Sequence, residues 1–195
     1  MFPDTPVIQF QDPLGDLLGA GEDAFHYTFN DAVKLAGHAC PTVAGAFLLV
    51  KRAVEILYPD SPPQRGDIEI KVSGGVAEGV NGPMSQVMTL LTGAAAENGF
   101  KGLGGLHARE GLLSFDSGEP HPPTRFTFKS RSNGRSTSLV YSPQGFPPAP
   151  EMGPALQAIL SGNDDPQVRE QFQNAWRGRV LAILADGGET TVGQV

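Results

Sequence analysis

The segment 41–73 constrains the fold most, because it places a long amphipathic helix directly before an alternating strand. Within 41–58, apolar side chains recur at the spacing of one helix face: Val43, Phe47, Val50, Val54 and Leu57. Residues 67–73 alternate between apolar and charged side chains, which indicates a strand with one buried face. Helices stacked on one face of a sheet bury both apolar surfaces.

The rest of the chain supplies further elements of such a fold. The sequence predicts, in order, a short helix capped by Asn30 or Asp31 and ended by Gly37, a helix from Pro83 to about Asn98, strands at about 105–115, 124–130 and 137–141, and closing helices at 151–160 and 166–185. The glycine-rich loop 74–82 leads into the helix at Pro83. Asn133-Gly134 predicts a hairpin between the last two strands.

This element order predicts an α+β fold. We expect an α-β-α-β-β-β unit with a mixed sheet, helices on one face of the sheet, and a carboxy-terminal helical appendage. Residues 1–29 are expected to form an irregular arm, 30–145 the α/β domain, and 146–195 helices and a frayed tail that pack on the same domain.

Composition and charge exclude several classes of protein. The single cysteine, Cys40, rules out an internal disulfide framework and any cluster held by several cysteines. A net charge of −7 with only 14 Lys and Arg argues against a nucleic-acid or anionic-membrane partner. Residues 1–20 contain no Lys or Arg, unlike a secretory signal, and no apolar run reaches the length of a membrane helix. We therefore expect a soluble cytoplasmic protein.

The segment 36–42, Ala-Gly-His-Ala-Cys-Pro-Thr, is the strongest candidate for chemistry. Cys40 falls at the N-cap of the helix that Pro41 opens, where the partial positive charge favours a thiolate. His38 adds either a second metal ligand or a base for a nucleophile. The alternative is structural: a small buried cysteine beside a histidine satisfied within a turn.

Zinc is the metal that these residue types suit best. A tetrahedral site takes four ligands, or three ligands and a water molecule. The chain offers the donors His38, Cys40 and His107, with Glu78 or His26 in reserve. His121 lies among prolines and is expected to be a solvent-exposed loop residue. The donors predict a zinc site with mixed nitrogen, sulfur and oxygen ligands.

With Gly-His-Ala-Cys-Pro at 37–41 ahead of a long helix, the chain resembles the FmdE-like family, which takes its name from a component of formylmethanofuran dehydrogenase. That family shows His-Gly-His-x-Cys-Pro-Gly, then a strand, a polar loop and a helix ending near Thr-Gly-Cys; here Leu-Thr-Gly-Ala stands at 91–94. The resemblance covers about 30–141. It implies a fold like the catalytic domain of glyceraldehyde-3-phosphate dehydrogenase, and metal-binding or reactive roles for His38 and Cys40.

The chain also departs from the family's pattern. Ala36 replaces the first histidine, Thr42 replaces the glycine after proline, and Ala94 replaces the cysteine after Thr-Gly. A redox-active cysteine pair within one chain is therefore impossible, and any metal site must recruit ligands such as His107 and Glu78.

Three functions remain open at this point. The first is a zinc-binding protein that holds or activates a small polar ligand at the His-x-Cys site. The second is a metal-free enzyme with Cys40 as nucleophile and His38 or His107 as base. The third is a non-catalytic accessory protein or binding module. An open sheet face and apolar carboxy-terminal helices also predict a homodimer.

Overall fold

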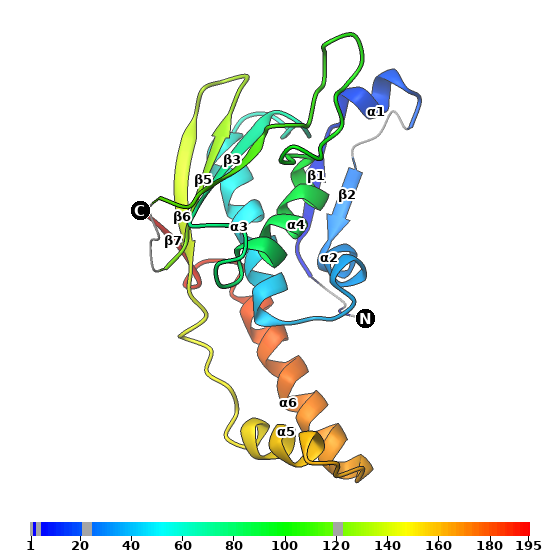
Figure 1. The fold of residues 1–195 in the computed structure, drawn as a ribbon, viewed down its shortest axis with the longest axis vertical. Helices are drawn as coiled ribbons and strands as arrows, with labels where there is room; N and C mark the ends of the chain where they lie inside the picture. The colour runs from blue at the N-terminus through cyan, green and yellow to red at the C-terminus, as the bar shows by residue number, and fades with distance from the viewer. Residues whose placement is uncertain (1, 3–4, 21–24, 119–122) are drawn as a thin grey trace.

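The computed structural model describes residues 2, 5–20, 25–118 and 123–195, which form an α+β fold with a five-stranded mixed sheet (Figure 1). Its elements are β1 (Val7–Phe10), α1 (Pro13–Leu17), β2 (Phe25–Thr28), α2 (Phe29–Ala36), α3 (Pro41–Leu57), β3 (Ile68–Ser73), α4 (Asn81–Thr92), β4 (Leu113–Asp116), β5 (Arg125–Ser130), β6 (Ser136–Tyr141), α5 (Met152–Leu160), α6 (Pro166–Ala185) and β7 (Val192–Gln194). The predicted α-β-α-β-β-β unit is confirmed, and it corresponds to the elements from α3 to β6.

The main sheet has the strand order β4-β3-β5-β6-β7. Only β3 and β4 are parallel, and α4 is part of the crossover that a parallel pair requires. In β3, Ile70 is buried beneath the helices whereas Lys71 is exposed on the other face. The helices pack on one side of the sheet, as Figure 1 shows, so the predicted layering is confirmed.

Helix α3 lies at the centre of the molecule and contacts α2, α4, α6 and the sheet. The single apolar face predicted for it is too narrow, because residues outside that face, such as Leu48 and Leu49, are also fully buried. A helix covered on several sides is apolar around most of its circumference. The position of α3 therefore fixes the positions of the helices around it.

The structure corrects the predicted ends of the chain. The frayed tail is wrong, because β7 adds to the sheet edge with Gly193 opposite Val140. Asp186 holds the turn before β7 by accepting hydrogen bonds from Thr190 and Thr191. The irregular amino-terminal arm is also wrong: β1 and β2 pair as antiparallel strands, and α1 lies between them in the chain.

The strand predicted at 105–115 is also wrong over most of its length. Only Leu113–Asp116 forms β4, and the preceding residues form a loop. Within that segment Gly105, His107 and Gly111 have positive φ angles of 80°, 58° and 75°, which extended strand backbone does not adopt. The closely spaced glycines favour turns, and this preference outweighs the tendency of the apolar residues between them to form a strand.

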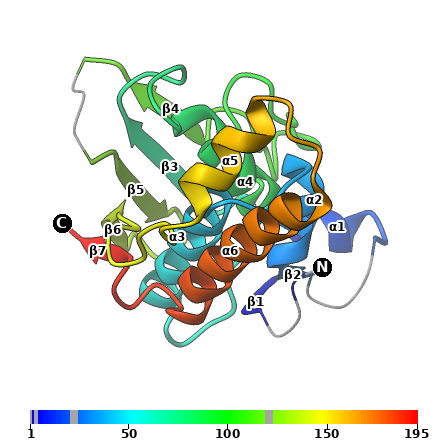
Figure 2. The same ribbon diagram turned by 90° about the horizontal axis from the view of Figure 1, so that it is seen from below.

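The carboxy-terminal helices form a hairpin that projects from the body of the molecule (Figure 1), and Figure 2 shows the two helices side by side. Helix α6 has the predicted bounds and packs against α3 through its final turns, where Val180 and Ile183 are fully buried. Leu160, at the end of α5, is exposed. Over the described parts of the chain, no helix is long and apolar enough to cross a membrane.

A buried ion-pair cluster ties the amino-terminal hairpin to the body. Arg109 Nη2 donates to Asp12 Oδ1 at 2.6 Å, and Arg65 Nη1 donates to Asp12 Oδ2 at 3.1 Å. The side chains of Asp12 and Arg109 are each only 6% exposed. Burial alone would raise the pKa of Asp12, but the hydrogen bonds from Arg109 and the Gly15 N–H, with the charges of both arginines, lower that pKa.

We expect Asp12→Asn to lower the free energy of unfolding at pH 7 by about 3 kcal/mol, because it leaves the buried guanidinium of Arg109 and the partly buried guanidinium of Arg65 without a counter-charge. A lowered carboxyl pKa contributes stability above the unfolded-state value of 3.8, and this contribution is lost as the pH falls below it. The difference between wild type and variant should therefore shrink in acid. Urea denaturation between pH 7 and pH 2.5 measures both effects.

Asp16→Asn is the matched control, since Asp16 is exposed in the same helix, α1. It should change stability by less than about 0.5 kcal/mol. Equal losses in the two variants, or a loss in Asp12→Asn that does not vary with pH, would contradict the role given to this cluster.

Candidate functional site

The turn between α2 and α3 presents His38 and Cys40. Gly37 ends α2 in the left-handed conformation, with a φ angle of 74°. Cys40 is the N-cap of α3 in extended conformation, and Pro41 occupies the first helical position. The predicted positions of Gly37, Cys40 and Pro41 are confirmed.

Two aromatic side chains from distant parts of the chain hold the backbone of this turn. Trp176 Nε1, on α6, donates to the Ala39 carbonyl at 2.7 Å. The Tyr141 hydroxyl, on β6, donates to the Pro41 carbonyl at 2.8 Å. Burial raises the pKa of Tyr141, and nearby Cys40 adds to this although the charge of Arg179 opposes it, so the phenol stays a donor at neutral pH. The turn is thus fixed on both sides of Cys40.

His38 and Cys40 line a cavity of about 260 Å³ together with residues from the first half of α4. Cys40 is half-buried and His38 is exposed. His38 Nδ1 lies 2.9 Å from the Ala36 carbonyl oxygen, an acceptor, so a neutral ring carries its proton on Nδ1 and keeps Nε2 as its basic nitrogen. The structure therefore places both predicted residues at one cavity.

The other predicted ligands lie elsewhere. Glu78 is exposed ahead of α4, with its carboxylate against Gly74, and does not line this cavity. His107 lies two residues before Arg109, whose side chain packs on Gly93 just beyond the C-terminal end of α4. The cavity of His38 and Cys40 is instead at the N-terminal half of that helix.

The predicted zinc ligands therefore do not converge. In the parts of the chain that the structure describes, no three His, Cys, Asp or Glu side chains are placed to hold a metal ion. His26 is exposed on β2, and His121 lies outside the described residues. His38 and Cys40 alone do not make a zinc site of three or four protein ligands.

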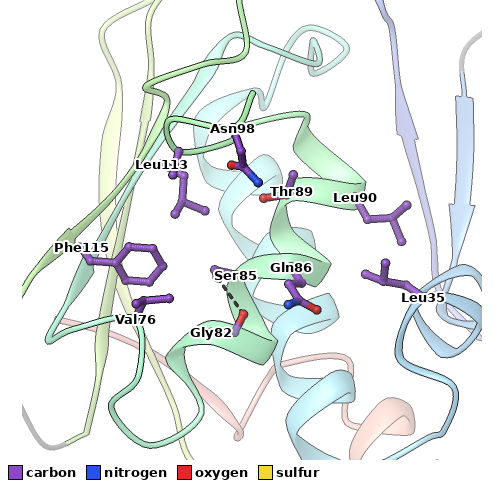
Figure 3. Close-up of a pocket in the computed structure, with 11 residues that line it drawn as sticks. Leu35, Val76, Gly82, Ser85, Gln86, Thr89, Leu90, Asn98, Leu113 and Phe115 are labelled. Atoms are coloured by element: carbon purple, nitrogen blue, oxygen red, sulfur yellow. Dashed lines mark hydrogen bonds between the residues drawn. The ribbon is translucent and has the colours of Figure 1, made fainter. Parts of the chain in front are cut away.

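A second cavity, of about 450 Å³, lies between α4 and β4 (Figure 3). It shares Leu35 and Gln86 with the cavity of His38 and Cys40. Apolar side chains such as Phe115 wall it on the sheet side, while the hydroxyl of Thr89 and the amide of Asn98 supply polar groups. Such a lining suits an organic molecule with few polar atoms.

A third cavity, of about 530 Å³, shares Thr89, Leu90 and Asn98 with the second and contains the Asp12–Arg65–Arg109 cluster. The three cavities thus adjoin along the outer face of α4, and we name them together the α4 groove. A helix of 12 residues is about 18 Å long, which sets the scale of the groove.

Sequence reasoning missed the α4 groove. The sequence signal was the second face of α4, where Gln86 and Thr89 lie opposite the buried Met84, Met88 and Leu91. A face of mixed polarity beside an apolar stripe is also typical of a solvated helix surface. A groove differs from a solvated helix surface because α2 and β4 lie on either side of α4, and the local sequence pattern does not predict that arrangement.

Comparison of the chain with known protein families, with curated proteins and with solved structures finds no match in any of the three. The resemblance to the FmdE-like family therefore stays a prediction from the residues at 37–41. Function has to be argued from the site itself.

We expect Gly45→Ala to destabilise the protein by about 2 kcal/mol, because the added methyl group would overlap the Tyr141 ring and displace the side chain that holds Pro41. Gly178→Ala is the matched control: Gly178 is also inside a helix, but an added methyl group meets nothing within 4 Å. The control should stabilise by about 0.5–1 kcal/mol. Urea denaturation checks both, and a stabilised Gly45→Ala variant would contradict the packing described.

Proposed function

We propose that this protein binds a small organic molecule in the α4 groove, with Cys40 and His38 at one end of the bound ligand. The observation that carries the proposal is the row of three adjoining cavities of about 260, 450 and 530 Å³. The two larger volumes fall within the range of about 300–1,000 Å³ that ligand sites occupy. Their linings combine apolar walls with a few polar groups, which is the composition of such sites.

The arrangement at Cys40 supports a covalent step as the second candidate. The thiol is half-buried at the N-terminus of α3, where the helix dipole favours negative charge, and it lines the same cavity as the imidazole of His38. The thiol would lose its proton to a base such as His38 Nε2 and add to a carbonyl carbon; the sulfur–carbon bond forms as the carbon–oxygen π bond breaks, and the π electron pair passes to the oxygen.

Disulfide exchange at Cys40 tests the ligand-binding proposal, because Cys40 is the only cysteine in the chain. Small aliphatic and aromatic disulfides compete for Cys40 in the presence of 2-mercaptoethanol, and intact-protein mass spectrometry reports which adducts persist. A binding groove selects a minority of fragments, since non-covalent contacts stabilise their adducts. Gln86→Trp should remove this selection, because Gln86 lines both cavities nearest Cys40.

Gln167→Trp is the matched control, since Gln167 is exposed at the start of α6 and lines none of these cavities. It should leave the fragment preference unchanged. Equal capture of all fragments by wild type, or the same preference in Gln86→Trp, would overturn the proposed function.

Zinc binding stays a prediction from the sequence. Because the described residues bring only His38 and Cys40 together, a bound zinc ion would need donors that this arrangement does not supply. Plasma mass spectrometry of protein purified without a histidine tag measures the zinc content, and well under one zinc ion per chain would refute zinc binding at His38 and Cys40. One zinc ion per chain that is lost in both His38→Ala and Cys40→Ser would show that the ligands do converge and would revise the proposal.

A homodimer and a cytoplasmic location also stay predictions. The support for a homodimer is the hairpin of α5 and α6, which projects from the body and leaves Leu156 and Leu160 exposed (Figure 1). Exposed apolar side chains gathered on a projecting element are typical of surfaces that a partner covers.

A further inference from the structure

The cavity at the C-terminal end of α4 differs from the other two in its charge. Asp12, Arg65 and Arg109 all line it, so its described lining residues carry two guanidinium groups and one carboxylate. Within this described lining, one positive charge therefore remains after Asp12 has been neutralised. Buried charges are costly unless paired, so an excess positive charge in a cavity indicates a place for an anion.

The hydrogen bonds show which arginine is available to that anion. Arg65 donates from Nε to the Leu91 carbonyl, from Nη2 to the Leu90 carbonyl and from Nη1 to Asp12. Arg109 donates only from Nη2, to Asp12, and its buried Nε has no hydrogen-bond partner among the described residues. A buried donor without a partner is rare in native proteins and calls for an explanation. Arg109 Nη1 lies beside Gly93, which lines the cavity, and makes no hydrogen bond to the described residues, so Nη1 is the donor left for a ligand; Nε lies against Gly66, outside the cavity lining.

Two glycines position the Arg109 side chain. A methyl group on Gly93 would overlap the guanidinium, and one on Gly66 would lie 2.8 Å from Nε. Both glycines have positive φ angles, of 76° and 81°. The guanidinium is thus enclosed by backbone at two places that exclude larger residues, which makes its placement a built feature of the fold.

Apart from Thr89 and Asn98, the side chains that line the rest of this cavity are apolar. Leu14, Leu18, Phe25, Leu90 and Phe100 line it around the charged cluster. An inorganic anion would leave these side chains without contacts, whereas an organic anion buries its apolar part against them. The lining thus favours a carboxylate attached to an aliphatic or aromatic body.

We propose that the Arg109 end of the α4 groove binds the carboxylate of a small amphipathic organic acid, with the apolar body lying between Phe25, Leu90 and Phe100. The carboxylate accepts charge-assisted hydrogen bonds from Arg109. The proposal names the ligand class for the groove and so rests on the proposed function, in which the other end of the groove lies at Cys40.

Isothermal titration calorimetry with octanoate tests the proposal. Wild type should bind one octanoate per chain at least about tenfold more tightly than 1-octanol, which has the same body without the charge. Acetate, which has the charge without the body, should also bind at least about tenfold more weakly. Arg109→Met should lose at least about tenfold in octanoate affinity, and Arg109→Lys should retain part of it. Equal affinities of wild type for octanoate and 1-octanol would overturn the proposal, as would the absence of saturable octanoate binding.

A second pair of variants leaves the buried ion pair intact. Phe100 is 79% exposed at the cavity lining, so Phe100→Asp and Phe100→Asn should both fold. The two side chains have nearly the same shape, so their difference isolates the added negative charge. Phe100→Asp should bind octanoate about tenfold more weakly than Phe100→Asn, with no difference for 1-octanol. Equal octanoate affinities in this pair would overturn the proposal even if Arg109→Met does not fold.

The outcomes separate this proposal from the proposed function. Octanoate binding that depends on Arg109, together with no fragment selection at Cys40, would support the anion site and refute the continuous groove. Fragment selection at Cys40 without octanoate binding would support the groove and refute the anion site.

Discussion

The burial of α3 is the constraint on which the rest of the structure depends. Its side chains pack against the sheet, α2, α4 and α6, and Phe47, Leu48, Leu49 and Val50 are fully buried. Because α4 buries one face against α3, its opposite face is left for the α4 groove. The N-cap of α3 is Cys40, so the same helix also places the thiol at one end of that groove. The position of α3 therefore determines both the packing of the core and the geometry of the site.

The two ends of the groove differ in chemistry because different parts of the chain build them. At one end, Trp176 and Tyr141 fix a turn that presents a thiol and an imidazole. At the other end, the amino-terminal hairpin contributes Asp12, which pairs with Arg65 and Arg109. A ligand with an anionic group and a distinct second functional group suits such a groove. The Asp12 cluster therefore has two roles: it stabilises the attachment of the amino-terminal hairpin, and it sets the charge of the cavity.

The sequence predicted the features that local pattern determines. The left-handed Gly37, the N-cap Cys40 and the bounds of α6 each depend on neighbouring residues, and each is confirmed. Pairing between distant segments was missed. Strand β7 pairs with β6, where Gly193 lies opposite Val140, and Arg109 pairs with Asp12 although 97 positions separate them. His107 and Glu78 were assigned to the zinc site by residue type alone. Their positions in the sequence do not predict where the loops that carry them lie relative to α4.

Nitrogen-15 NMR of the arginine Nε–H groups tests whether Arg109 binds a carboxylate in the α4 groove. The Arg109 Nε–H is buried with no hydrogen-bond partner in the described part of the chain, so its resonance, assigned by comparison with Arg109→Lys, reports on the guanidinium itself. Addition of octanoate should shift this resonance saturably, with smaller changes at Arg65, and 1-octanol should not reproduce the shift. An Arg109 resonance unaffected by saturating octanoate would contradict the account.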